Sequence, residues 1–203
     1  MNDQNEPLYV LEETVLDELR HEPKAPELIR QLRGYSMIHV DLLHATRLFE
    51  QLQVITSQAG VDEDLAESLW WTATGKYGRC FNTAKVRVVR LDRTRFAASL
   101  STEQKGVHAF LLDARDNHIA HASSAAHERA SFVFRLEADG LKPIGRKVQS
   151  VSPNEKLVRQ AADVCSTAAA FAAEMALEAG ERFFPLVMRV DPETWRARAQ
   201  PLR

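Results

Sequence analysis

The sequence predicts a mainly α-helical protein: a bundle of four to five helices with a small β-hairpin before the last long helix. Apolar residues recur at three- and four-residue steps in four separate segments, which is the spacing of one face of a helix. Residues around 131–149 alternate instead, and a turn sequence, Asp139-Gly140, interrupts them. With 203 residues, 45% of them hydrophobic, the chain is long enough to bury one core.

Three regions are predicted along the chain. Residues 1–33 form an N-terminal helical arm, with a short acidic helix over 8–19 that ends before the prolines that follow it. Residues 34–180 form the helical bundle, which includes the hairpin at 131–149. Residues 181–203 form a C-terminal tail, whose three prolines predict an extended or single-turn segment.

Start and stop signals place the first three helices of the bundle. The first helix follows Gly34 and runs to Gly60, and the second begins near Asp62, a good cap residue. The third begins with Ser101 and Gln104, which match a capping box.

The last helix has the clearest signals. Residues 152–155, Ser-Pro-Asn-Glu, supply a cap, a proline at the first helical position and a glutamate that reaches back, and Gly180 is placed to end the helix. Its alanine-rich faces permit close approach of helices and leave an apolar surface wide enough for a second copy, so a homodimer is predicted. These alanines are Ala168, Ala169, Ala170, Ala172 and Ala173.

Composition narrows the functional classes. The net charge of −2 gives no general attraction to nucleic acid, so such binding needs a local basic patch. No apolar run approaches the roughly 18 residues that span a bilayer, and the N-terminal residues lack the basic and apolar regions of a signal peptide. We therefore expect a cytoplasmic protein without a membrane partner. Cys80 and Cys165 fall in apolar periodic segments, which predicts buried free thiols.

The stretch 111–121 concentrates groups that move protons and bind phosphate. Arg115 offers a planar fork of donors, and the imidazole of His121 titrates near neutral pH. On an ideal helix these side chains lie about 120° apart, on opposite sides of the buried stripe. A site that uses both needs the last turn to distort or a second subunit. His108 shares a face with Arg115, and Asn117 either orients the His121 ring or caps the helix.

The histidines also allow a metal interpretation. His108, His118 and His121 are zinc-ligand types, but they lack a fourth ligand at local spacing and spread around the helix. We therefore expect no metal and no cofactor, and His118 is kept as a supporting residue of the site.

Arg115-Asp116 followed by His121, at the end of a helix, resembles the signature of the HEPN superfamily. That signature is an arginine, a polar residue and then a histidine after four to six positions. Arg33 and His39 match the same spacing, but that match straddles a predicted helix boundary.

A second block on the preceding helix resembles abortive-infection U-type members of that superfamily. It consists of Trp70-Trp71 and Tyr77-Gly78-Arg79-Cys80-Phe81. The two blocks and the bundle around them cover residues 34–177. For the two tryptophans, core packing and base stacking are both open, and core packing is favoured.

The resemblance implies a compact helical bundle that dimerises around the motif helix and, in active members, a metal-independent endoribonuclease. By that analogy His121 takes the proton of a ribose 2′-hydroxyl or supplies one to the leaving oxygen, while Arg115 stabilises charge on the phosphate. A cyclic phosphate end results. Asp116 holds Arg115 or the histidine in place. Tyr77 and Arg79 either stack on RNA and contact phosphate, respectively, or form a buried hydrogen-bonded pair.

A basic segment over 85–95 has five basic residues and one acidic residue. Arg87, Arg90 and Arg93 either track an RNA backbone or form a solvated face.

Two functional classes follow. The first is an HEPN-type endoribonuclease that binds RNA and acts in abortive infection, in other phage defence or as a toxin. The second is a non-catalytic helical dimer that binds RNA, a nucleotide or an antitoxin-like partner.

Overall fold

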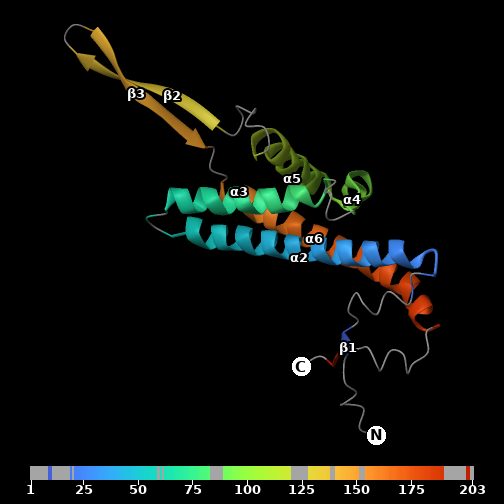
Figure 1. Ribbon diagram of the computed structural model, residues 1–203. Helices are drawn as coiled ribbons and strands as arrows, with labels where there is room; N and C mark the ends of the chain where they lie inside the picture. Colours follow the sequence, from blue (N-terminus) through green and yellow to red (C-terminus); the bar gives the residue numbers. More distant parts are fainter. Residues whose placement is uncertain are drawn as a thin grey trace.

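The computed structural model describes residues 9–10, 19, 21–58, 60, 62–82, 89–119, 128–137, 140–150, 154–189 and 200–201. This part of the chain is mainly helical, as predicted (Figure 1). Its helices are α2 (Ala25–Thr56), α3 (Glu63–Arg79), α4 (Arg93–Ser99), α5 (Thr102–Asp113), the π-helix η2 (Ala114–Ile119) and α6 (Glu155–Val187).

The strands pair in two antiparallel ladders. Strand β2 (Glu128–Glu137) pairs with β3 (Gly140–Ser150), and the register shifts between Val133 and Phe134. Strand β1 (Tyr9–Val10) pairs with β4 (Gln200–Pro201). The helix predicted over 8–19 is therefore wrong at Tyr9 and Val10, because an aromatic and a β-branched residue suit the pairing with β4. Most of that predicted helix lies outside the described residues.

The long helices α2 and α6 lie side by side, and α3 lies along α2 (Figure 1). Helix α5 packs between α3 and α6, so the apolar faces of these helices enclose one core. The largest buried side chains of that core are Phe49, Trp70, Tyr77, Phe81 and Phe96. Cys80 and Cys165 are buried free thiols, as predicted.

Helix α2 begins earlier than predicted. It starts at Ala25 and crosses residue 33, where a boundary was expected, without a break. Pro26 sits in the first turn, where its missing N–H has no helical acceptor to lose. Gly34 is buried inside the helix, and tertiary packing offsets its helix cost of about 1 kcal/mol.

Helix α6 also extends beyond its predicted range. It runs to Val187, so residues 181–187 of the predicted tail are helical. A Cβ on Gly180 would meet Leu32 of α2 at 3.8 Å, so this glycine faces a neighbouring helix and does not end its own. The cap at the other end is Asn154, which accepts a hydrogen bond from the Leu157 N–H at 2.8 Å. Ser152 was the predicted cap and lies outside the described residues.

Most of the alanines of α6 pack inside the chain. Ala168, Ala169 and Ala172 are 0–2% exposed, and the core they belong to includes the apolar residues of α2. These three alanines are therefore covered by the chain itself, whereas Ala170 is exposed and Ala173 is half-buried, and the homodimer stays a prediction. Two predicted caps are confirmed: Asp62 accepts from the Leu65 N–H at 3.1 Å, and Ser101 with Gln104 forms the capping box.

No helix among the described residues has both the length and the apolar character needed to cross a membrane.

Candidate functional site

Arg115 crosses α3 at a glycine. A Cβ placed on Gly78 would lie 2.5 Å from Cγ of Arg115 and 2.7 Å from its Cβ. Such distances are far inside van der Waals contact, so only a glycine leaves room for this arginine. The aliphatic stem is thereby fixed on α3, while the side chain as a whole remains 30% exposed.

Asp116 holds the guanidinium group. Its Oδ1 accepts hydrogen bonds from Arg115 Nη1 at 2.9 Å and from Asn82 Nδ2 at 3.1 Å. Its Oδ2 lies 3.2 Å from Arg93 Nη2, which also donates to Asn82 Oδ1 at 2.5 Å. We call these four residues, Asn82, Arg93, Arg115 and Asp116, the motif cluster. Asp116 was predicted to hold either Arg115 or the histidine in place, and the structure bears out the hold on Arg115.

The motif cluster joins three segments of the chain, and the carboxylate of Asp116 in it stays charged. Asn82 follows α3, Arg93 begins α4, and Arg115 and Asp116 lie in η2. Burial alone would raise the pKa of Asp116, but hydrogen bonds from Arg115, Asn82 and Arg93, together with the Arg93 charge, outweigh it and lower that pKa. Two guanidinium groups around one carboxylate leave a net positive charge, which suits a phosphate ligand.

The helix that carries Arg115 widens where α5 passes into η2. From Ala114 to Ile119 the backbone is π-helical, with i→i+5 hydrogen bonding, and such turns are frequent at functional sites. The 120° separation expected for Arg115 and His121 assumed an ideal α-helix and does not hold past Ala114. The side chains of Asn117 and His118, and all of His121, lie outside the described residues.

Tyr77 and His108 form a buried pair one residue away from Gly78. Both are almost fully buried, and Tyr77 Oη lies 2.6 Å from His108 Nδ1. The imidazole lies edge-on to the rings of Phe81 and Phe96, with centroids 4.9 and 5.2 Å away. Burial, and to a smaller extent the charge of Arg93, lower the pKa of His108 from 6.5 to about 4. The imidazole is therefore neutral at pH 7.

This pair corrects one expectation and bears out another. Tyr77 is 0% exposed, so it cannot stack on RNA in this structure. His108 and Arg115 both face α3, at Tyr77 and Gly78, so the face they were predicted to share is confirmed, with His108 buried and Arg115 partly exposed. Tyr77 belongs to a buried hydrogen-bonded pair, but its partner is His108 and not Arg79.

Arg79 points to a different helix. It donates to Asp41 of α2, and Lys76 Nζ lies 3.8 Å from the same carboxylate oxygen. Its role as a phosphate contact at the motif is therefore not supported by its position. Trp70 is 2% exposed and packs on Phe49, which bears out the core interpretation.

The structure describes two of the three arginines predicted to bind RNA, and their surroundings differ. Arg93 joins the motif cluster, Arg90 is exposed, and Arg87 lies outside the described residues. Asp92 caps α4 by accepting from the Arg95 N–H at 2.8 Å, so part of the predicted basic segment is a short helix. Arg95 on that helix faces α6, where it lies 3.3 Å from Glu178 and over the ring of Phe171.

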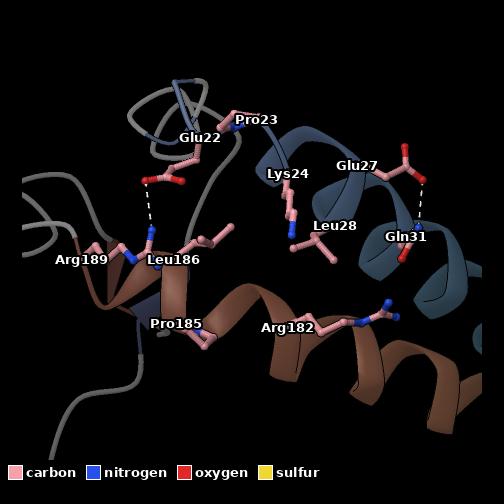
Figure 2. A pocket seen from close by; sticks show the side chains of 10 residues that line it. All are labelled: Glu22, Pro23, Lys24, Glu27, Leu28, Gln31, Arg182, Pro185, Leu186 and Arg189. Carbon is pink, nitrogen blue, oxygen red and sulfur yellow. Dashed lines mark hydrogen bonds and ion pairs between the residues drawn. The ribbon is translucent and has the colours of Figure 1, made fainter.

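A pocket of about 750 Å³ lies elsewhere, between the start of α2 and the end of α6 (Figure 2). It carries both signs of charge: Arg189 pairs with Glu22 at 3.4 Å, and Glu27 accepts from Gln31 at 2.9 Å. None of the predicted site residues is among those that line it.

Sequence reasoning missed Gly78 and Asn82 as members of the site. Gly78 stood in the second block of the resemblance, and that block was its one available signal. Asn82 has no pattern around it.

No protein-family model matches this chain, and neither a curated protein nor a solved structure is similar to it.

Proposed function

We propose that this protein is a metal-independent endoribonuclease of the HEPN type, with its reaction centre at Arg115 and His121. The observation that carries the proposal is the placement of Arg115. Its stem is fixed on Gly78, Asp116 holds one edge of its guanidinium, and the group stays partly exposed. A preorganised cation of this kind stabilises charge that develops on a phosphate. In the sequence, His121 follows the last residue of η2, Ile119, by two positions.

The proposed reaction needs no metal ion. The ribose 2′-oxygen attacks phosphorus while His121 removes its proton, and the bond from phosphorus to the 5′-oxygen breaks. The leaving oxygen takes up a proton from water or from the His121 of a second copy. The products are a 2′,3′-cyclic phosphate and a 5′-hydroxyl. Arg115 donates to the nonbridging phosphate oxygens, whose charge rises in the transition state. The homodimer rests on the sequence alone.

The test compares two arginine-to-glutamine variants in the presence of EDTA. Arg115→Gln keeps most of the stem on Gly78 and removes the charge, and we expect RNA cleavage to fall by about 100-fold or more. Arg95→Gln removes the same charge from an arginine that pairs with Glu178, and it should cleave like the parent protein. His121→Ala should match Arg115→Gln. Gel analysis of several RNAs and end-group analysis of the products measure both effects.

Two results would count against the proposal. One is cleavage by Arg115→Gln at the parental rate, and the other is loss of cleavage on addition of EDTA. Binding of RNA by the parent protein without any cleavage would favour the second class, a helical binding protein that does not catalyse. Growth arrest on expression, relieved by Arg115→Gln, would fit the proposed role in phage defence or as a toxin.

A further inference from the structure

We infer that Arg93 is a second phosphate-binding residue of the motif site and that Asn82 is its positioning residue. The inference deepens the proposed function and rests on it for the cleavage reaction. Its substrate class is the phosphodiester backbone of single-stranded RNA, contacted by two guanidinium groups. The phosphate-binding part can be tested without any cleavage.

Arg93 and Arg115 converge on the carboxylate of Asp116. Arg93 and Arg115 come from different helices, yet they bond the two oxygens of one carboxylate, at 3.2 and 2.9 Å. A carboxylate and a phosphate present similar pairs of oxygens to an arginine. Two guanidinium groups that converge on Asp116 are therefore close enough to contact one phosphate group or two neighbouring ones.

Asn82 fixes this convergence. Its amide nitrogen donates to Asp116 at 3.1 Å and its amide oxygen accepts from Arg93 at 2.5 Å. One side chain thus determines the distance between the carboxylate and the second arginine. An arginine restrained in this way loses less side-chain entropy when it binds a ligand than a freely moving one does.

Arg93 and Arg115 both keep donors that the motif cluster does not use, and both are open to solvent. The bonds within the motif cluster use one nitrogen of each arginine, whereas each guanidinium has five N–H donors. The side chains of Arg93, Asp116 and Arg115 are 43, 34 and 30% exposed. A ligand can reach both arginines from solvent while Asp116 keeps them in place.

The competing explanation is that Arg93 only holds α4 against η2. Such a role would change the stability of the fold, but it would not change the number of ions released when RNA binds. For single-stranded nucleic acids, the logarithm of the binding constant falls linearly with the logarithm of the salt concentration. The slope of this line is about 0.7 for each phosphate that the protein contacts. The slope therefore separates a phosphate ligand from a structural ion pair.

The experiment measures the affinity for a short 2′-O-methyl RNA across a range of NaCl concentrations. This probe has no free 2′-hydroxyl, so it cannot be cleaved by the proposed reaction. Arg93→Gln should lower the slope by about 0.7, and Arg93→Lys, which keeps the charge, should retain it. Arg95→Gln is the matched control on the same helix and should leave the slope at the parental value. Asn82→Ala changes no charge, yet its slope should fall toward that of Arg93→Gln.

The outcomes distinguish the two proposals. Equal slopes for the parent protein, Arg93→Gln and Arg95→Gln overturn the inference, even where the parent cleaves RNA. Lower slopes for both Arg93→Gln and Arg115→Gln support the inference, and a parent that cuts no RNA would then refute only the nuclease. A parental slope for Asn82→Ala beside a lowered slope for Arg93→Gln overturns the positioning role of Asn82.

Discussion

Two contacts of α3, one with α5 and one with η2, lie side by side, and their properties are opposite. Tyr77 contacts His108 inside the core, while the next residue, Gly78, lies under Arg115 at the surface. The inner pair is enclosed by aromatic rings. The outer contact leads to the motif cluster, whose side chains remain partly exposed.

Solvent access explains the difference. Burial raises the pKa of Tyr77 and lowers that of His108, so both groups stay neutral. At Asp116 hydrogen bonds to cations outweigh burial, its pKa falls, and the carboxylate stays charged. We therefore expect the inner pair to contribute to stability, and we propose ligand binding for the outer cluster.

The largest expected effect is an acid sensitivity that comes from His108. Its pKa is lowered from 6.5 to about 4 in the folded protein, so the unfolded chain binds this proton at higher pH than the folded chain does. Stability from this group is therefore complete above about pH 6.5 and is lost as the pH falls toward 4, by roughly 3 kcal/mol. Urea unfolding of the parent and of His108→Gln, at several pH values, measures the difference.

The control for this measurement is His44→Gln, the same substitution at an exposed position of α2. Other acidic and basic groups contribute equally to the parent and to each variant, so only the difference between them reports on His108. The free energy of unfolding of the parent minus that of His108→Gln should fall between pH 7 and pH 4. If this difference stays constant, His108 is not the source of the acid sensitivity.

A smaller loss of stability should follow from Tyr77→Phe. This change removes the hydroxyl that lies 2.6 Å from His108 Nδ1 and leaves a buried ring nitrogen without its partner. We expect the free energy of unfolding to fall by about 2 kcal/mol, with no change in the salt slope of RNA binding. Tyr35→Phe, at a half-buried site on α2, is the control for loss of a hydroxyl. A changed salt slope in Tyr77→Phe would contradict the separation of the two contacts.

Gly78→Ala should have the smallest effect on stability and a large effect on activity. The added methyl group collides with Arg115, and overpacking of this kind costs about 1–3 kcal/mol, against a helix-propensity gain of about 1 kcal/mol. We expect a net loss of about 1 kcal/mol and RNA cleavage close to that of Arg115→Gln. Gly106→Ala, where nothing lies within 4 Å, should stabilise α5 and keep full activity. Full activity in Gly78→Ala would show that the position of Arg115 is not critical.

Signals that act within a few residues could be predicted from the sequence. Asp62 and Ser101 cap the helices they were expected to cap, because a cap side chain and the backbone N–H that donates to it lie three residues apart. Trp70 lies in the core, which was the favoured of the two interpretations for a large aromatic side chain. Arg115 and Asp116 were recognised because they are neighbours in a motif.

Contacts between distant segments could not be predicted in the same way. Gly34 and Gly180 looked like helix ends, yet both lie inside long helices, and the packing of α2 on α6 overrides their local preference. Asn82 and Arg93 join Asp116 only after α3, α4 and η2 have packed together. No local periodicity encodes that juxtaposition.

The π-helical turn at Ala114–Ile119 gives the motif a tolerance to insertion and deletion. Its i→i+5 hydrogen-bonded ring holds one more residue than the α-helical ring does, so a single deletion in this turn would convert it to ordinary α-helix. The helix before it, with its apolar contacts to α3 and α6, would keep its register. The separation between Arg115 and the residues that follow the turn can therefore change by one position without a shift of α5, whereas the contact of Arg115 with α3 requires a glycine at position 78.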